Sequence, residues 1–95
     1  MSNKFMTWNE LEKELKLTPE QEAQIQFEID IIDATIQARK KNKLSQRSLS
    51  KKSGIAQPVI ARLEKYANSP QVNTLLKLLY PLGYTLRVVP IDKKK

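Results

Sequence analysis

The sequence contains no cysteine and no histidine. Without cysteine the chain can form neither a disulfide nor a thiolate metal site. Without histidine it lacks the usual metal ligand and the side chain best suited to proton transfer near neutral pH. The acidic residues fall on an amphipathic arm, and the serines have no candidate base beside them except lysine. We therefore expect no enzymatic activity, no metal and no cofactor.

Long apolar runs are also missing. No stretch approaches the roughly 20 residues of a membrane-spanning helix, and the N-terminus has no signal-peptide pattern. The basic region is interrupted at Gly54 and Pro58, which argues against a helix that lies on a membrane surface. We expect a cytoplasmic protein with no membrane partner. Its 95 residues make at most one small domain with a modest core, so dimerisation would help to bury apolar surface.

Charge is abundant and divided along the chain. Residues 1–33 carry three lysines and eight acids, residues 39–65 carry nine bases and one acid, and residues 66–95 carry five bases and one acid. The net charges of these segments are −5, +8 and +4, which account for the overall +7. An acidic arm followed by a basic body favours two surfaces with different partners. The simpler alternative is that surface helices carry charge without a partner.

Helix caps and apolar spacing predict a mainly α chain of five helices, of which the first ends near Lys16. Thr18, Pro19 and Gln21 form a strong helix start, with a capping residue, a proline at the first position and a capping-box partner. The second helix should run from there to about Lys41. The apolar face of the short first helix consists of Trp8, Leu11 and Leu15.

The second helix has two apolar stripes on nearly opposite faces. The stripes are Ile25, Ile29, Ile32 and Ile36 on one side and Phe27, Ile31, Ala34 and Ala38 on the other. A small domain buries one face of a surface helix, so the second stripe must be covered by the first helix, a second copy or a partner. The sequence does not decide which stripe faces the partner.

Two short helices joined by a tight turn follow the long one. Ser45 is the expected N-cap of the first, Gly54 ends it in the left-handed conformation, and Pro58 lies in the first turn of the next. A fifth helix should run from about Val72 to Leu79. Its expected core side chains are Leu75, Leu76, Leu78 and Leu79.

The segment from Tyr84 to Pro90 is rich in β-branched and aromatic residues and predicts one β-strand. A single strand leaves its backbone groups unpaired, and no second strand is visible in the sequence. We expect it to pair with the same strand of a second copy across a two-fold axis. An extended tail on its own helices is the alternative. The expected dimer contacts are Tyr84, Leu86, Val88 and Val89.

The middle of the chain resembles the Xre/Cro/CI helix-turn-helix family, which has a lambda repressor-like fold. The residues that carry the resemblance are Arg39, Leu44-Ser45-Gln46, Leu49, Gly54, Ile60, Glu64, Pro70, Leu75 and Leu82-Gly83. The LGYTLRVVP tail and the long N-terminal arm resemble HigA-like antitoxins of bacterial toxin–antitoxin modules. We therefore divide the chain into an acidic, partner-binding helical arm that is continuous with the long helix (residues 1–33), a DNA-binding domain (residues 34–83) and a dimerising tail with one strand (residues 84–95).

The family resemblance implies roles for individual residues. Gln46 would contact phosphate and brace the recognition helix, and an internal ion pair would join Arg39 to Glu64. Base edges would be met by Gln57, Ala61 and Arg62, a set that also follows from turning Ile60 and Leu63 inward. The expected phosphate contacts are Lys65 and Asn68, with Ser45 and Arg47 as weaker candidates.

Two residues depart from the family pattern, which often has glycine at their positions. If Lys43 must adopt a positive φ, the cost is roughly 1 kcal/mol unless Asn42 takes the strain. Tyr66 is expected to fill the core or to lie against the DNA backbone.

The resemblance implies an antitoxin that neutralises a small basic ribonuclease toxin of the RelE/HigB type and, as a dimer, binds operator DNA to repress its own operon. Residues 1–35 should then hold the toxin and be dispensable for operator binding, in an expected heterotetramer with two toxins. The alternative is a stand-alone repressor of a phage or mobile element. The expected toxin contacts are Trp8, Leu11, Leu15, Phe27 and Ile31.

Overall fold

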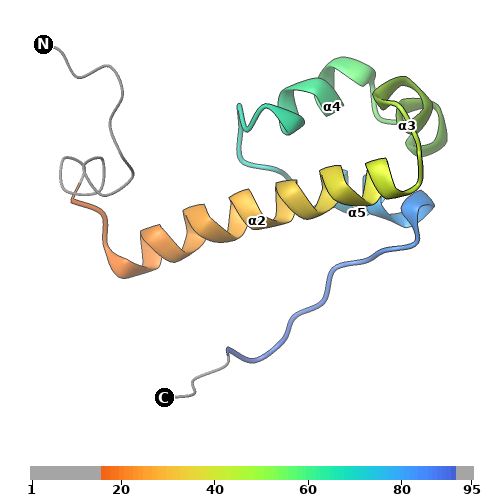
Figure 1. Cartoon of the computed structure of the whole chain (residues 1–95). Coiled ribbons are helices and arrows are strands. Elements are labelled where there is room, and N and C mark those ends of the chain that lie inside the picture. The colour runs from red at the N-terminus through yellow and green to blue at the C-terminus, as the bar shows by residue number, and fades with distance from the viewer. Residues whose placement is uncertain (1–15, 92–95) are drawn as a thin grey trace, which may run out of the picture.

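The computed structural model describes residues 16–91, which form a mainly α-helical domain (Figure 1). Its elements are four α-helices and a short 3-10 helix: α2 (Pro19–Lys41), α3 (Gln46–Ser53), α4 (Gln57–Glu64), α5 (Val72–Leu79) and η1 (Tyr80–Leu82). Their bounds agree with the last four of the five predicted helices. The predicted first helix, with Trp8, Leu11 and Leu15, lies outside the described residues. None of the helices described is long and apolar enough to cross a membrane.

The helix α2 begins as its local sequence predicts. The Thr18 side chain accepts a hydrogen bond from the Gln21 amide at 3.1 Å, and the Thr18 amide donates to the Gln21 side chain at 2.9 Å. This reciprocal pair satisfies two amides that a helix start leaves without partners. Acidic residues in its first turn and basic residues in its last turn suit the helix dipole.

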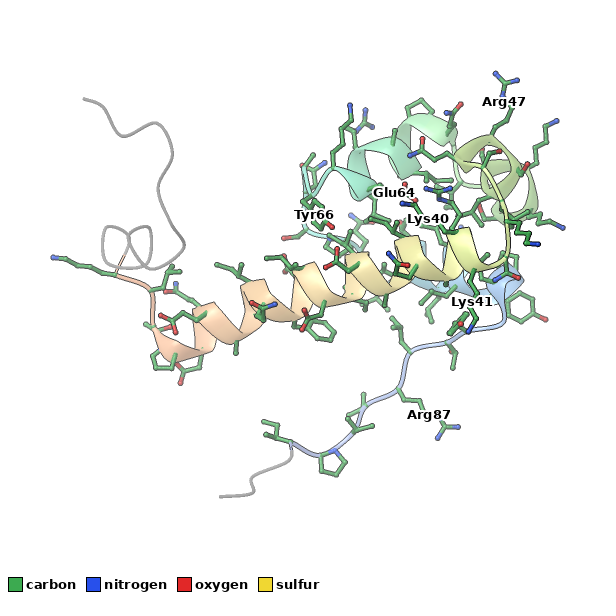
Figure 2. The ribbon with its side chains drawn as sticks, in the orientation of Figure 1. Lys40, Lys41, Arg47, Glu64, Tyr66 and Arg87 are labelled. Atoms are coloured by element: carbon green, nitrogen blue, oxygen red, sulfur yellow. The ribbon has the colours of Figure 1, made fainter. Side chains whose placement is uncertain are left out.

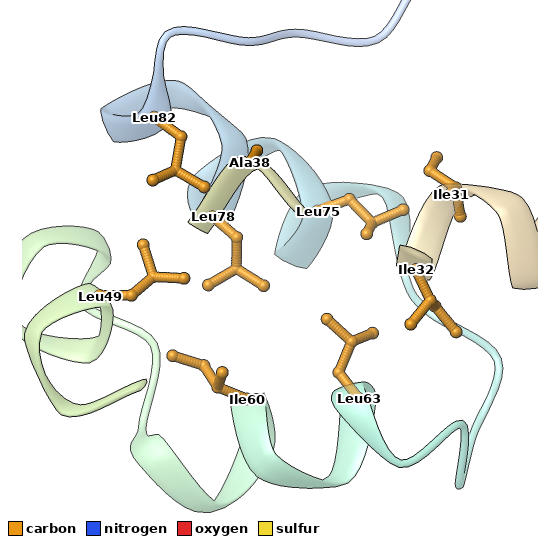
Figure 3. Close-up of a cluster of buried hydrophobic side chains, with 9 residues drawn as sticks. All are labelled: Ile31, Ile32, Ala38, Leu49, Ile60, Leu63, Leu75, Leu78 and Leu82. Carbon is orange, nitrogen blue, oxygen red and sulfur yellow. The ribbon is translucent and has the colours of Figure 1, made fainter. Parts of the chain in front are cut away.

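The core lies where the C-terminal half of α2 packs against α4 and α5, with α3 closing the other side (Figure 3). Its buried apolar side chains are Ile31, Ile32, Ala38, Leu49, Ile60, Leu63, Leu75, Leu78 and Leu82. Thr35 is also buried, and its hydroxyl donates to the Ile31 carbonyl at 2.8 Å, so it adds no unsatisfied group. Leu76 is 39% exposed and does not belong to this core, contrary to the sequence-based expectation.

The N-terminal half of α2 extends beyond the other helices (Figure 1). Ile25 and Ile29 are half-buried there, and Phe27 is 61% exposed. The residues of both predicted stripes are therefore buried only in the second half of α2. This half alone lies against α4 and α5.

The boundary predicted between residues 33 and 34 falls inside the long helix, which the sequence predicts to continue across it. The helix α2 is continuous across it, and Ile31 and Ile32 on its N-terminal side belong to the core. Each such side chain contributes on the order of 2–4 kcal/mol. Removal of residues 1–35 would therefore disrupt the core, so the expectation that this segment is dispensable for DNA binding conflicts with the fold.

The predicted C-terminal strand is wrong for the single chain, since residues 84–91 contain no strand. A strand is defined by hydrogen bonds to a neighbouring strand, and none exists among residues 16–91. The segment is extended, Leu86 rests against the core, and Val88 is fully exposed. The β-type composition therefore produces an extended tail here rather than a paired strand.

Three helix ends share the Schellman motif, in which the residue after the cap takes a positive φ. After α2, the Lys43 amide donates to the Lys40 carbonyl and the Leu44 amide to the Arg39 carbonyl, with φ 59° at Lys43. The Asn42 cap has φ −84°, so the strain falls on Lys43. The end of α4 has φ 59° at Tyr66, and η1 ends with φ 87° at Gly83.

We expect Lys43→Gly to raise the free energy of unfolding by about 1 kcal/mol, because glycine adopts this φ without steric strain. The gain corresponds to a rise in Tm of about 4–8 °C in a domain of this size. Gly83→Ala provides the matched opposite change, since a Cβ there would meet nothing within 4 Å and only the backbone would be strained. Lys43→Ala is the control for loss of charge. If Lys43→Ala stabilises the domain as much as Lys43→Gly does, backbone strain at Lys43 is not the cause.

Candidate nucleic-acid interface

The helices α3 and α4 form a helix-turn-helix in which one serine caps the start of α3 and two others hold the turn. The Ser45 hydroxyl caps α3 by accepting a hydrogen bond from the Ser48 amide at 3.0 Å. The Ser50 hydroxyl donates to the Ile55 carbonyl at 2.6 Å, and the Ser53 hydroxyl accepts from the Ile55 amide at 3.1 Å. These bonds leave Gly54, at φ 78°, as the left-handed residue between the helices.

The orientation of α4 follows from two buried side chains. Ile60 is inaccessible and Leu63 nearly so, and both point into the core (Figure 3). The helical period then turns Gln57 and Arg62 to solvent, with Ala61 half-buried beside them. The three side chains expected to read bases therefore lie on the outer side of one helix.

A bidentate ion pair ties the end of α4 to α2. The Arg39 Nε lies 2.8 Å from the Glu64 Oε2, and the Arg39 Nη2 donates to the Glu64 Oε1 at 2.9 Å. The third guanidinium nitrogen donates to the Leu44 carbonyl at 2.8 Å. The side chains of the pair are only 12% and 9% exposed. The ion pair expected between Arg39 and Glu64 is thus present, and Arg39 is occupied inside the protein.

Gln46 adds α3 to this network, because its side-chain amide donates to the Glu64 Oε1 at 2.9 Å. Burial by itself raises the pKa of Glu64, but the hydrogen bonds from Arg39 and Gln46 and the charges of Arg39 and Lys40 outweigh it. The pKa of Glu64 is consequently lowered from its ordinary value. Glu64 is the single acid among residues 39–65, and its charge is compensated internally.

The other residues expected to contact DNA lie mostly at the surface. Exposed side chains are those of Ser45, Arg47, Gln57, Arg62, Lys65 and Asn68, and half-buried ones are those of Gln46 and Ala61. Figure 2 shows Arg47 projecting outward from α3, whereas Lys41 lies beside α2 near its end. The Ser45 hydroxyl already donates to the Ser48 hydroxyl at 3.1 Å, so it acts first as a helix cap.

Acidic residues occupy the opposite end of the domain. All the charged side chains of α2 before Arg39 are acids: Glu20, Glu22, Glu28, Asp30 and Asp33. Because this part of α2 leads away from α3, the charge division seen along the sequence is also a division in space (Figure 1). A nucleic acid is attracted to the helix-turn-helix end and repelled from the acidic end.

The two expected toxin contacts on α2 differ in their exposure to solvent. Phe27 is exposed and available to a partner. Ile31 is 8% exposed and packs in the core, so its assignment to a partner surface is corrected. The physical reason is that Ile31 falls within the half of α2 that lies on α5, whereas Phe27 lies one turn before it.

Two contacts join α2 to the loop after α4, and sequence reasoning missed both. The Tyr66 hydroxyl donates to the Asp33 carboxylate, and the Ser69 hydroxyl donates to the Glu28 Oε1 at 3.0 Å. The hydrogen bond to Asp33 raises the pKa of Tyr66. Tyr66 is half exposed and does not fill the core, contrary to one of the two expectations for it.

Comparison with known proteins identifies one protein family and several individual proteins that are similar to this chain. The family described as Helix-turn-helix matches residues 36–89. An uncharacterized HTH-type transcriptional regulator of Haemophilus influenzae is 41% identical over 87 residues, which are 92% of this chain and 88% of that protein. Antitoxin HigA1 of Mycobacterium tuberculosis is 36% identical over 59 residues, 62% of this chain and 40% of that protein.

A solved structure is also similar. A chain of a toxin–antitoxin module from Streptococcus pneumoniae superposes with a TM-score of 0.68 at 39% sequence identity, and the match covers 92% of this chain and 96% of that one. The similarity therefore extends beyond the helix-turn-helix to most of the chain.

We expect Glu64→Ala to lower the free energy of unfolding by about 3 kcal/mol, because it leaves the Arg39 guanidinium desolvated without its counter-charge. Thermal unfolding followed by circular dichroism measures the loss. Asp30→Ala, which removes an exposed acid from α2, is the control and should change Tm little. An unchanged Tm for Glu64→Ala together with tighter DNA binding would show that the pair is not structural.

Acid unfolding tests the same pair. Because the folded-state pKa of Glu64 is lowered, its contribution is complete above the unfolded pKa of about 4.3 and is lost as the pH falls through the folded value. The stability difference between wild type and Glu64→Gln in urea unfolding should therefore shrink as the pH falls below about 4.

Proposed function

The chain belongs to the Xre-type helix-turn-helix family, and we propose that it is a HigA-like antitoxin that represses its own operon and neutralises a toxin. The observation that carries the proposal is the separation of charge in one small domain. A basic helix-turn-helix stands at one end, and at the other stands an acidic helix that DNA would repel. Membership of the family explains the basic surface as a DNA-binding surface. The acidic surface would bind a partner other than DNA.

In this proposal, α4 enters the major groove and reads base edges. Arg62 can pair with guanine through two hydrogen bonds, Gln57 can do so with adenine, and Ala61 offers a contact to a thymine methyl group. Phosphate contacts come from Arg47, Lys65 and Asn68, with smaller parts for Ser45 and Gln46. The Arg39–Glu64–Gln46 network keeps α4 in place relative to α2 and α3.

We propose that operator binding requires a dimer formed through the tail. Residues 84–91 are extended and expose Val88 and Val89, and their backbone can pair with the same segment of a second copy. Tyr84 and Leu86 complete the proposed interface. A two-fold dimer would present both α4 helices to one face of DNA, with half-sites about 34 Å apart.

The proposed second partner is a small basic ribonuclease toxin of the RelE/HigB type, two of which would bind the dimer. The acidic half of α2 suits a basic protein through charge complementarity, which governs specificity and association rate. Similarity to a chain of a toxin–antitoxin module over 92% of the sequence supports this choice.

A stand-alone repressor is the second candidate. It is favoured by the H. influenzae relative, which matches over 92% of the chain and is named as a transcriptional regulator alone. In that case α2 would serve the fold and self-association only. A neighbouring reading frame that encodes a small basic protein supports the antitoxin, and its absence supports the repressor.

We expect Arg62→Ala to weaken operator binding by about 1–3 kcal/mol, because a contact to base edges is lost. Lys77→Ala removes the same charge from the surface of α5, away from α4, and should leave the affinity nearly unchanged. Fluorescence anisotropy with operator DNA between 50 and 200 mM salt measures both variants, and wild-type affinity should fall by orders of magnitude over this range. Equal losses for the two variants would indicate non-specific attraction instead of base reading.

We expect expression of the neighbouring basic protein to arrest growth and degrade RNA, and co-expression of this chain to restore growth. Arg62→Ala should still restore growth while failing to repress a reporter placed behind the operator, because the two functions use opposite ends of the domain. Growth assays and reporter activity measure the two outcomes. Loss of protection in Arg62→Ala would contradict the division, and absence of any protection would refute the antitoxin.

A further inference from the structure

A groove of about 350 Å³ runs between α2 and the loop that follows α4. Its floor is the stripe of Ile25, Ile29 and Ile32 on α2, and its other wall is the loop of residues 66–69. Glu28 stands at the rim, where the Ser69 hydroxyl and the Gln24 side-chain amide donate to its two oxygens at 3.0 Å and 3.2 Å. Figure 2 shows Tyr66 between the end of α4 and α2, at the same loop.

Among the residues that the structure describes, the carboxylate of Glu28 is hydrogen-bonded only to neutral groups, those of Gln24 and Ser69. Within residues 16–91 the single ion pair joins Arg39 to Glu64, so no cation of the described chain compensates Glu28. At 100° per residue, Glu22, Glu28 and Asp33 all lie within about 80° of the isoleucine stripe. The groove therefore combines an apolar floor with an acidic rim at Glu28 that no cation among residues 16–91 pairs with.

The opposite face of α2 has a different character. A second groove of about 370 Å³ lies there, lined by Phe27, by Leu76 of α5 and by Leu86 to Val88 of the tail. Arg87 is the charged side chain that lines it. The groove lies next to the tail of residues 84–91, the segment proposed for self-association. The charged side chain that lines the groove on the isoleucine stripe is thus an acid, Glu28, and the one that lines the groove on the Phe27 stripe is a base, Arg87.

We propose that the acid-rimmed groove, and not the Phe27 face, is the docking site for the toxin. It fits a lysine or arginine whose aliphatic stem lies on Ile25 and Ile29 and whose cationic head meets Glu28. The inference rests on the proposed antitoxin function and adds to it the face of α2 that the toxin uses.

Charge complementarity selects this occupant over two others. The chain's own residues 1–15 carry three glutamates and two lysines, so they bring no net positive charge to the rim. A second copy carries its positive charge in residues 39–65, the surface assigned to DNA, and in residues 66–95, which include the tail assigned to self-association. A separate basic protein can meet the acidic rim while leaving α4 uncovered, and the groove shares only Asn68 with the proposed DNA contacts.

The test compares two charge reversals on one helix in the full-length chain. Glu28→Lys acts at the groove, whereas Asp30→Lys makes the same change at an exposed position that bonds only to Gln26. Isothermal titration with the basic protein of the neighbouring reading frame should give an affinity about tenfold weaker or worse for Glu28→Lys and within about threefold of wild type for Asp30→Lys. Ile25→Ala with Ile29→Ala should also weaken binding.

Two controls separate docking from folding. Ser69→Ala removes the hydrogen bond to Glu28 without changing charge and should leave toxin affinity within about twofold. Operator affinity and Tm should stay at wild-type values in Glu28→Lys, because this part of α2 lies outside the core.

Other outcomes overturn the proposal and identify a different occupant. Loss of toxin binding in Asp30→Lys and Phe27→Ala, with Glu28→Lys unaffected, would move the docking site to the opposite face and leave the antitoxin function intact. Unchanged toxin affinity in Glu28→Lys with an altered mass in light scattering would assign the groove to a second copy. Unchanged affinity with a shifted emission of Trp8, the single tryptophan, would assign it to residues 1–15. Failure of the wild-type chain to bind would instead refute the proposed function.

Discussion

The bidentate ion pair between Arg39 and Glu64 is the interaction on which the DNA-binding geometry depends. It joins α2 to the end of α4, and Gln46 brings α3 to the same carboxylate, so three helices meet at one charged group. A carboxylate with several charge-assisted donors holds its partners in a narrow range of orientations. The same contacts neutralise Glu64, the single acid among residues 39–65. The negative charge of Glu64 therefore does not reduce the positive potential at the surface of this segment.

The helix α2 serves two surfaces because only half of it is needed for the core. Its second half contributes Ile31, Ile32, Thr35 and Ala38 to the interior, while its first half keeps polar and apolar side chains at the surface. The acidic end described in the structure is consequently an extension of a core helix. A partner held there would rest on an element whose position the core defines, which lowers the entropic cost of binding.

The loop of residues 66–69 connects the two surfaces. It follows α4 directly, carries Asn68 on the proposed DNA side, and is tied to α2 through Glu28 and Asp33. Tyr66 adopts a left-handed conformation that is costly for a non-glycine residue, and its hydroxyl gains a bond to Asp33 in that position. The hydrogen bond to Asp33 thus offsets part of the backbone strain at Tyr66. Nothing described in the structure explains why lysine stands in place of glycine at Lys43.

The sequence by itself determined the helices, because caps, prolines and apolar spacing act over a few residues. Thr18, Ser45 and Gly54 marked helix ends correctly, and the inward turn of Ile60 and Leu63 defined the exposed side of α4. Only the tertiary structure decided which half of α2 is buried and that the tail has no strand partner within its own chain. It also brought Glu28 to Ser69 across 41 positions, since such contacts depend on how helices pack and leave no local pattern.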